Sequence, residues 1–418
     1  MTEPDVEQFR ADADAWLGAR LERRPIDRSH DIVWGEGDFS VSVFHALDHD
    51  EEAALLDEIR TWVQAKAELG YHAITWPVEH GGLGLSKAHG RAFSRLEAQY
   101  VTPSGHETLG VTTGLIAPTI EIFGTDAQKE QFLAPLLRTD VFACQLFSEP
   151  GAGSDLGALA CRAERDGDEW VVNGQKVWSS GAQFSDWGEL IARTDPDVAK
   201  HKGMTAFMVP MDAEGVEVRP IGQMSGGSSF SEVFFTDVRI PDRLRLGPVG
   251  EGWKVALTTL SFERDHSSSG GGGSRVGGSW RQLLATAQAL GVTDDPIIRD
   301  ALVDVYLHSQ VERYTMRRAA DLARGGRPGP EGSLGKLMWT EGMRRISDAV
   351  SLVLGPRLTA DSGEWGTYAW AEHVLGAPGY RIAGGSDEVQ RNIIGERVLG
   401  LPGEPRVDKG VPFKDIPR

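Results

Sequence analysis

The sequence predicts an α+β protein in which a helical region is followed by a β-rich region and then by a second helical region. Three observations predict this order: apolar residues recur at helical spacing in the first third, short β-branched and aromatic runs fill the middle third, and helical spacing returns after residue 252. A chain of 418 residues is long enough for two or three domains. We expect these domains at residues 1–143, 144–246 and 247–418.

The first region is predicted to contain a helix that stops near Gly70. The apolar residues of this helix recur three or four positions apart and are Leu55, Leu56, Ile59, Trp62 and Val63. Glycine is typical of the position just after a helix, and Pro77 prevents the pattern from continuing. Residues 79–84 are rich in glycine and are interpreted as a loop between helices.

The middle region is predicted to form an antiparallel sheet or barrel. Its short runs of β-branched and aromatic residues lie at positions 170–172, 190–192, 205–209, 216–218 and 233–235. Gly, Asp and Pro separate these runs, which is the pattern of short strands joined by turns.

The last region is predicted to be helical again and to include one long helix. The residues expected to face its core are Ile298, Leu302, Val305, Leu307, Val311 and Tyr314. Four consecutive glycines at 270–273 precede this long helix, and each costs about 1 kcal/mol relative to alanine inside a helix. We therefore expect a break there, either as a surface connection or as a loop beside a ligand pocket.

Composition excludes several classes of function. The formal net charge of −18 comes from 61 acidic and 43 basic residues, and without a basic block it argues against nucleic-acid binding. No stretch is long and apolar enough to insert into a membrane, and the acidic N-terminus lacks the apolar run of a signal peptide. Cys144 and Cys161 have no metal-site or disulfide spacing, so we expect no metal and a cytoplasmic protein.

The most informative segment runs from Gln145 to Ser180. Its turn contains Gly151 and Gly153, which can expose backbone N–H groups to a phosphate, and Ser154 adds a hydroxyl. Ser148 is placed to hydrogen-bond a flavin ring, and Trp178 is placed to pack against the ring's apolar edge. A flavin site is the combination that uses all of these groups.

These motifs resemble the acyl-CoA dehydrogenase family from Trp76 to Pro402. The resemblance implies a helical N-terminal domain, a middle β domain and a C-terminal four-helix bundle. It also implies FAD as cofactor, an acyl-CoA substrate and an electron-transfer flavoprotein as acceptor. The cofactor-binding residues that it implies are Gln145, Phe147, Ser148, Gly153, Ser154, Trp178, Ser180, Ser386 and Glu388.

The resemblance also directs the search for a catalytic base. The family's commonest base position is occupied here by Gly384, whose backbone N–H is expected to contact the thioester oxygen. Some family members carry the base in a Glu-Arg pair on an earlier helix, which corresponds here to Glu263 and Arg264. We therefore predict Glu263 as the base, because burial would raise its pKa toward the working pH. Arg264 and Ser154 are predicted substrate contacts.

Two nearby acidic residues are rival candidates for the base. Asp387 and Glu388 follow Gly384 by three and four positions and are also consistent with the first turn of a helix. A structural ion pair between Glu263 and Arg264 is the alternative interpretation of that pair.

The sequence lacks the family motif that holds the ADP part of FAD across a subunit interface. No Arg-x-x-Phe-Gly string occurs between 279 and 299, and the later glycine pair is reduced to Gly355-Pro356. Two explanations remain: a homo-oligomer that binds FAD weakly, or a heterotetramer in which a second acyl-CoA dehydrogenase-like subunit supplies the contacts. The C-terminal segments 364–370 and 381–402 resemble the heterotetrameric dehydrogenases of bacterial sterol side-chain breakdown.

The predicted function is α,β-dehydrogenation of an acyl-CoA, and Gly384 leaves room for a branched or ring-bearing acyl group. The alternatives are an acyl-CoA oxidase or related flavin monooxygenase, and a non-catalytic scaffold subunit of a heteromeric dehydrogenase. Glu263, Ser148 and Trp178 argue against a scaffold, which would need none of them.

Overall fold

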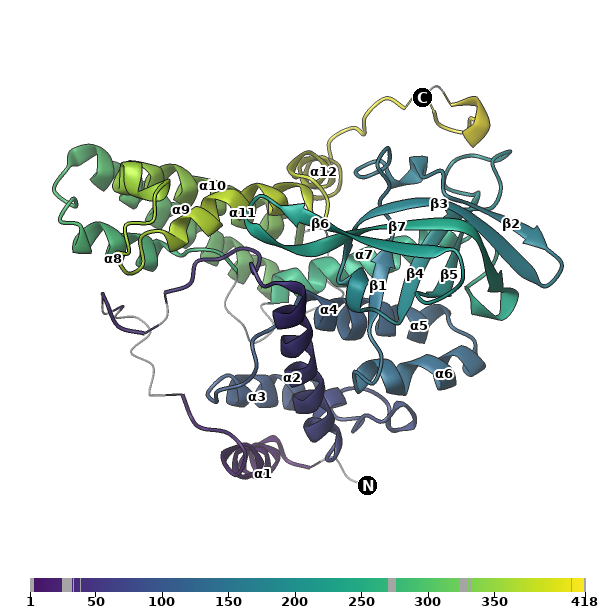
Figure 1. The fold of residues 1–418 in the computed structure, drawn as a ribbon, viewed down its shortest axis with the longest axis horizontal. Coiled ribbons are helices and arrows are strands. Elements are labelled where there is room, and N and C mark those ends of the chain that lie inside the picture. The colour runs from purple at the N-terminus through teal and green to yellow at the C-terminus, as the bar shows by residue number, and fades with distance from the viewer. Residues whose placement is uncertain are drawn as a thin grey trace.

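The computed structural model describes residues 4–24, 32, 34–37, 39–269, 276–323, 330, 332–406 and 408–416, with the backbone alone at 263–269 and 323. The N-terminal helices are α1 (Val6–Gly18), α2 (His49–Ala67), α3 (Lys87–Glu97), α4 (Glu107–Gly110), α5 (Ala117–Phe123) and α6 (Asp126–Leu137). The strands are β1 (Ala143–Leu146), β2 (Arg162–Asp166), β3 (Glu169–Ser180), β4 (Trp187–Arg193), β5 (Met204–Pro210), β6 (Val216–Gln223), β7 (Gly226–Pro241) and β8 (Arg245–Leu246). The C-terminal helices are α7 (Gly252–Ser269), α8 (Trp280–Ala289), α9 (Pro296–Ala323), α10 (Gly332–Leu354), α11 (Ala369–Ile382) and α12 (Asp387–Ile393). The predicted α+β class and its order are confirmed (Figure 1).

The helix predicted before Gly70 is α2. Asp48 and Glu51 form a capping box at its start, which satisfies backbone N–H groups that would otherwise lack partners. Leu56, Ile59 and Val63 are buried along one face, as their spacing predicts. Gly70 follows in the left-handed conformation, which glycine adopts at little cost.

The middle region forms one sheet of eight strands. Its order is β6-β7-β3-β2-β4-β5-β8, with β1 paired to β4. Every predicted run lies within a strand, and the pairs are antiparallel apart from β1 with β4 and β2 with β4. The sheet is therefore antiparallel-rich, with β1 inserted in parallel so that the chain leaving it enters the Gly-rich turn.

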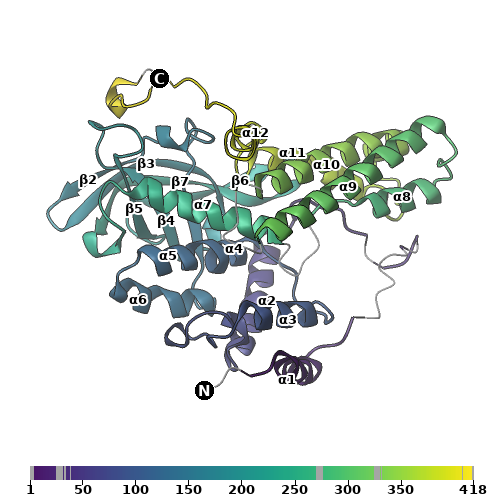
Figure 2. The same cartoon turned by 180° about the vertical axis from the view of Figure 1, so that it is seen from behind.

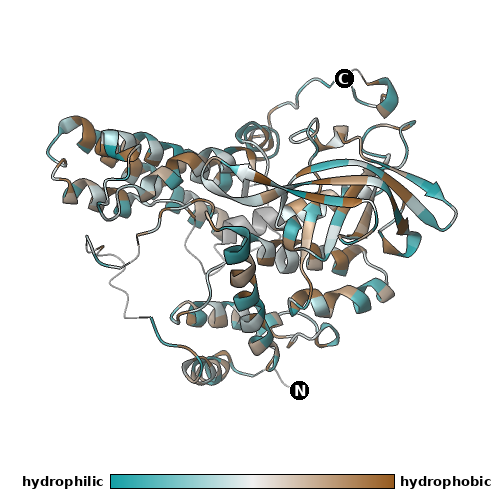
Figure 3. Cartoon of the chain, in the orientation of Figure 1, coloured by the Kyte–Doolittle hydropathy of each residue, from teal (hydrophilic) through white to brown (hydrophobic). Residues whose placement is uncertain are grey.

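The largest core lies between this sheet and the helices that cover one of its faces. Figure 2 shows α5, α6 and α7 on that side of the strands. Phe132, Leu133 and Leu136 of α6 pack with Phe207 of β5, and all four side chains are almost fully buried. Figure 3 shows hydrophobic and hydrophilic residues alternating along these helices and strands, as one buried face requires. The core fixes the sheet, and with it the Gly-rich turn, against the helices.

A second core holds the C-terminal helices around Trp370. The indole of Trp370 is fully buried, and its Nε1–H donates to the Thr286 hydroxyl at 3.0 Å. Ile298 and Val305 of α9 enter this core as predicted. The prediction is wrong for Leu307, Val311 and Tyr314, which are more than half exposed on the same helix. The physical reason is that α9 carries a second apolar row, which faces outward from the chain.

The end of the chain returns to the middle region. Phe413 packs under the guanidinium of Arg193, with 3.8 Å between the guanidinium carbon and the ring centroid. Lys200 bridges the tail to the Gly-rich turn, because it pairs with Asp155 at 2.9 Å and with Asp408 at 2.5 Å. The predicted break falls outside the described residues at 270–275, between α7 and α8. In the described part of the chain, no helix is both long and apolar enough to cross a membrane.

Candidate active site

The Gly-rich turn is fixed by the side chain of Glu149. One Glu149 oxygen accepts the Cys161 N–H at 2.9 Å and the Lys176 ammonium at 2.8 Å, and the other accepts the Ala160 N–H at 2.7 Å. Glu149 and Ala152 also exchange two backbone hydrogen bonds across the turn. The carboxylate therefore ties the turn to both β3 and the segment before β2.

Lys176 of β3 is the buried cation that pairs with Glu149. Its side chain is fully buried, and its ammonium also donates to the Phe147 carbonyl at 2.9 Å. A buried charge needs a partner and further hydrogen bonds, and Lys176 has both. The motif around Trp178 was recognised from the sequence, but this role of Lys176 and Glu149 was not. A lysine at alternating spacing in a strand gives no sign of a partner 27 residues away.

Trp178 sits in an unusual backbone position. Its φ is +62°, where a bulge shifts the register between β3 and β7, and its side chain is 58% exposed. A bulky residue with positive φ is strained, and bulges commonly re-aim a side chain next to a functional site. The indole contacts Phe230 edge-on, with centroids 6.2 Å apart. An exposed tryptophan held in this way is suited to pack against a flat ligand.

The other predicted cofactor residues of the middle region surround the same turn. Gln145 has a buried amide nitrogen without a hydrogen-bond partner, Phe147 is buried, and the Ser148 carbonyl accepts from Val177 N–H at 2.9 Å. Gly153 is exposed, and a Cβ built there would meet no heavy atom within 4 Å. Ser180 is half-buried at the end of β3.

These observations are consistent with bound FAD. The turn offers backbone and hydroxyl groups in open space, the buried Gln145 amide lacks a partner, and Trp178 presents an exposed ring. Orphaned buried polar groups call for an explanation, and a ligand with ring oxygens and nitrogens supplies one.

A loop from the C-terminal region reaches this turn. The Ser386 hydroxyl lies 3.4 Å from the Ser154 hydroxyl, which joins positions 232 residues apart. Ser386 also caps α12, because its hydroxyl accepts from Val389 N–H at 3.3 Å. Gly384 precedes it with φ of +63°, a conformation that favours glycine. The structure thus brings Ser154, Ser386 and the Gly384 loop together.

Asp387 holds that loop in place. Its carboxylate accepts from Arg381 and Thr340 at 2.8 and 2.9 Å, and the Lys336 ammonium lies 3.7 Å away. Burial disfavours the charged carboxylate, but these hydrogen bonds and the lysine charge outweigh it and lower the pKa. Asp387 is therefore a poor proton acceptor and a structural anchor. The rival Glu388, also a predicted cofactor contact, has a side chain that is 76% exposed and lies 3.7 Å from Arg391.

The predicted base lies on α7. The side chains of Glu263 and Arg264 lie outside the described residues, but the backbone of 263 is helical, one turn beyond Thr259. The Thr259 hydroxyl donates to the fully buried Glu189 of β4 at 2.8 Å. Burial raises the pKa of Glu189 to about 8, although the Thr259 hydrogen bond opposes the shift. This contact fixes α7 against the sheet.

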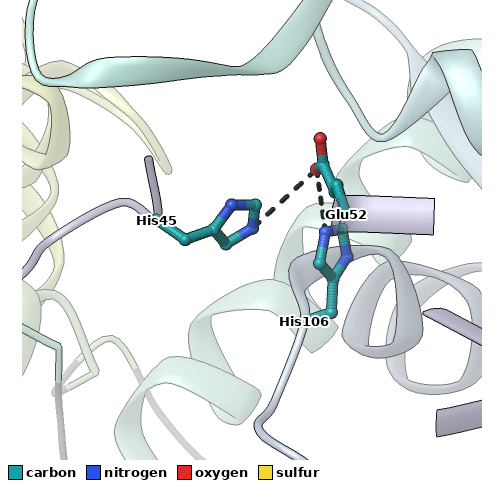
Figure 4. A group of neighbouring side chains, drawn as sticks. All are labelled: His45, Glu52 and His106. Carbon is teal, nitrogen blue, oxygen red and sulfur yellow. Dashed lines mark hydrogen bonds and ion pairs between the residues drawn. The ribbon is translucent and has the colours of Figure 1, made fainter. Parts of the chain in front are cut away.

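A buried polar cluster lies just beyond the end of β3 that carries Trp178. Glu52 accepts from His106 Nε2 at 2.9 Å and from the Gln183 amide at 3.0 Å, and His45 Nε2 is 3.8 Å away (Figure 4). His106 Nδ1 accepts the Thr108 N–H at 3.1 Å, so Nε2 carries the proton that it donates to Glu52. In this tautomer Nε2 has no free lone pair for a metal. The hydrogen bonds of the cluster join α2, the start of α4 and the turn after β3.

Glu107 is a further acidic residue near this cluster, and the sequence did not predict its environment. Glu107, at the start of α4, accepts from the Tyr380 hydroxyl of α11 at 2.9 Å and from Ser180. Burial raises the pKa of Glu107, although these hydrogen bonds and the nearby His106 oppose the shift. A single glutamate before a threonine carries no sequence signal of this environment.

Comparison with known proteins identifies the family of the chain. Models of the acyl-CoA dehydrogenase N-terminal, middle and C-terminal domains match residues 41–140, 144–238 and 250–399. Acyl-CoA dehydrogenase IpdE1 of Mycobacterium tuberculosis is 37% identical over 404 residues, which cover 96% of this chain and 99% of that protein.

Solved structures give the same result. The Tcur3481-Tcur3483 steroid ACAD is 26% identical with a TM-score of 0.71, over 96% of this chain and 98% of that one. The ChsE4-ChsE5 complex from Mycobacterium tuberculosis is 26% identical with a TM-score of 0.69, over 97% and 99%. The chain therefore belongs to the acyl-CoA dehydrogenase family, whose members are FAD-dependent oxidoreductases.

Proposed function

We propose that the protein introduces a double bond between the α- and β-carbons of a bulky acyl-CoA thioester, with Glu263 as the base. The observation that carries this proposal is the contact between Ser154 and Ser386, which joins the Gly-rich turn to the loop of Gly384. In this loop the family's usual carboxylate is replaced by glycine. A proton acceptor must then come from another element, and α7 carries the Glu263-Arg264 pair.

Each residue has a defined task in this reaction. Ser148, Ser154, Trp178 and the unpaired Gln145 amide hold the cofactor, and FAD, when bound, accepts the hydride from the β-carbon. Glu263 takes the α-proton, and the Gly384 backbone N–H stabilises charge that develops on the thioester oxygen. Arg264 and Ser154 position the substrate. The Gln145 amide nitrogen is assigned to the cofactor because it is buried and has no protein partner.

The acyl group is proposed to be branched or ring-bearing. Gly384 removes side-chain volume at the reacting end of the pocket. A solved relative at 26% identity carries the description steroid ACAD, which favours a ring system over a straight chain. Trp178, Phe230 and Tyr380 are half-buried or exposed near the turn and offer flat apolar surface.

The outer face of α9 is proposed to bind a second acyl-CoA dehydrogenase-like subunit. Its exposed apolar residues are Ile297, Val303, Leu307, Val311, Tyr314 and Leu322. The row continues into a cleft between α8 and α9 that Trp280 and Tyr306 line. A contiguous apolar surface of this kind is typical of a subunit interface. The chain also lacks the ADP-binding motif, and a relative was solved as the ChsE4-ChsE5 complex.

The subunit proposal is tested by purifying the chain alone and with a candidate second subunit. We expect fewer than one FAD per chain when it is alone, and a defined hetero-oligomer with full occupancy when the partner is present. Leu307→Asp should reduce assembly, whereas Leu69→Asp, at a leucine outside α9 that is 48% exposed against 55% for Leu307, should not. Full FAD occupancy in a homo-oligomer of the chain alone would contradict the proposal.

The activity is tested by anaerobic titration of the FAD-loaded assembly with straight, branched and ring-bearing acyl-CoA thioesters. We expect bleaching of the flavin absorbance, strongest with the ring-bearing thioester, and an enoyl-CoA product. Slow reoxidation in air would support a dehydrogenase that uses an electron-transfer flavoprotein, whereas rapid reoxidation would favour the alternative acyl-CoA oxidase or flavin monooxygenase. No bleaching with any thioester would favour a scaffold subunit.

The cytoplasm is proposed as the compartment. Cys144 and Cys161 are both buried free thiols, and burial raises their pKa values to about 12 and about 11. Reduced, unreactive thiols of this kind are typical of a reducing compartment.

A further inference from the structure

Five aromatic rings form a continuous row beside the candidate active site. Trp339 contacts Tyr380 with centroids 4.7 Å apart, Tyr380 stacks on Phe44 at 5.0 Å, Phe44 meets Phe230 at 5.4 Å, and Phe230 meets Trp178 at 6.2 Å. The rings come from α10, α11, the segment before α2, β7 and β3. We call this set the aromatic row, and it connects the N-terminal, middle and C-terminal regions.

Glu107 is a carboxyl group set against this row. The Tyr380 hydroxyl donates to its Oε1 at 2.9 Å, and Ser180, two residues after Trp178, hydrogen-bonds the same carboxyl. Within the described residues no Lys or Arg forms an ion pair with it. Burial raises the pKa of Glu107, so its neutral form is favoured relative to an exposed glutamate.

The position of Glu107 relates it to the reaction. Tyr380 lies on α11 four residues before Gly384, and Ser180 ends the strand that carries Trp178. Glu107, Tyr380 and Ser180 all retain partial exposure, so a ligand can contact them without unfolding an element. The carboxyl group is therefore hydrogen-bonded by two residues that lie, along the chain, next to the Gly384 loop and next to Trp178.

We propose that Glu107 is a specificity-determining residue that hydrogen-bonds a neutral oxygen, keto or hydroxyl, on the ring-bearing acyl group. The aromatic row packs against the flat apolar part of that group, and the Glu107 carboxyl group forms a hydrogen bond with its oxygen. This inference rests on the proposed dehydrogenation, since it names a feature of the substrate of the same site.

The chemistry around Glu107 favours a neutral oxygen over a charged one. A plain hydrocarbon chain would leave the carboxyl group facing apolar surface, which is costly for a buried polar group. A carboxylate on the substrate would approach both Glu107 and the buried Glu52 without a cation to pair with. The nearby His45 offers no such cation, because burial and the charge of His106 lower its pKa, although Glu52 opposes the shift.

The test compares three matched thioesters on the FAD-loaded assembly. They are 3-cyclohexylpropanoyl-CoA, 3-(4-oxocyclohexyl)propanoyl-CoA and 3-(4-hydroxycyclohexyl)propanoyl-CoA. For the unmodified protein we expect kcat/KM to be about 10-fold or more higher for at least one oxygenated analogue, which corresponds to one buried hydrogen bond. Comparison of the oxo and hydroxy forms identifies which oxygen is recognised.

The variants are Glu107→Leu, which removes the polar group, and Glu107→Gln, which keeps its shape. We expect Glu107→Leu to bring the ratio of oxygenated to plain kcat/KM close to one and Glu107→Gln to keep part of it. Glu189→Gln alters a buried carboxyl group on β4 that does not contact the aromatic row, and it should preserve the ratio of oxygenated to plain kcat/KM. If Glu107→Leu does not fold, the same ratio is measured in Tyr380→Phe and Glu107→Gln, for which we expect a smaller decrease.

Two outcomes overturn the inference, and they are distinguishable. An unchanged ratio in Glu107→Leu, or equal rates for the plain and oxygenated thioesters in the unmodified protein, would remove Glu107 from substrate selection while dehydrogenation stands. Absence of flavin bleaching with all three thioesters and with straight and branched ones would overturn the proposed function itself.

Discussion

The Gly-rich turn and the Gly384 loop meet at one candidate site but are built in opposite ways. The turn is held by a buried ion pair, in which Lys176 and Glu149 satisfy one another and several backbone groups. The loop has positive φ at Gly384 and Gly385, is anchored by Lys336 and Asp387 of its own region, and reaches the turn through Ser386. The comparison teaches that the turn is fixed by a buried ion pair, whereas the loop combines buried anchors with backbone conformations that favour glycine.

Breaking the buried ion pair should have the largest effect. Lys176→Met leaves the Glu149 carboxylate, which is 9% exposed, without its cation. Removal of one partner from a buried pair costs about 3–5 kcal/mol of unfolding free energy. Urea denaturation measures this loss, and FAD content should fall with it because the turn is released.

The control for this variant separates buried charge from charge in general. Lys254→Met removes a lysine that is 70% exposed at the start of α7 and should change stability little. The double variant Lys176→Met with Glu149→Gln should recover part of the loss, since no unpaired charge remains. Equal small losses in both single variants would show that the ion pair does not hold the turn.

The next largest effect on the free energy of unfolding is expected at the contact between Glu189 of β4 and Thr259 of α7, and it depends on pH. The folded pKa of Glu189 is about 8, above the ordinary value of 4.5 expected in the unfolded chain. The folded state therefore keeps a proton that the unfolded state loses, so this contribution to stability is full below about pH 4.5 and declines as the pH rises to about 8. The decline amounts to roughly 5 kcal/mol at most.

Glu189→Gln should remove that decline, because the amide does not titrate. The unmodified protein and the variant are compared by thermal and urea unfolding at pH 5 and pH 8.5. The variant is expected to gain stability relative to the unmodified protein at the higher pH. Parallel stability curves for the two proteins would show that Glu189 ionises freely in the fold.

Adding a side chain to the open loop should have the smallest effect on stability. Gly384→Ala places a Cβ on backbone with φ of +63°, which costs about 1 kcal/mol. It should also lower kcat/KM for ring-bearing thioesters more than for straight ones. Gly400→Ala is the matched control, because Gly400 has φ of +69° and nothing within 4 Å of a Cβ. A similar change in acyl preference in both variants would contradict a selective role for Gly384.

The sequence was sufficient for the fold class because periodicity reports which faces are buried, as α2 and the strands illustrate. It failed at the outer row of α9, because an exposed apolar row has the same helical spacing as one that enters the core. Long-range pairs were also not predictable. Glu107 and Tyr380 are 273 residues apart, and nothing in the local spacing of either residue indicates the other.

The most direct test of the central claim, that Glu263 of α7 replaces the carboxylate missing at Gly384, is the rate of anaerobic flavin bleaching. Glu263→Gln is compared with the unmodified protein and with Glu251→Gln, an exposed position just before α7, at equal FAD content. We predict that Glu263→Gln bleaches about 100-fold to 10,000-fold more slowly, whereas Glu251→Gln retains the rate. Bleaching of Glu263→Gln within a few-fold of the unmodified rate would contradict the assignment.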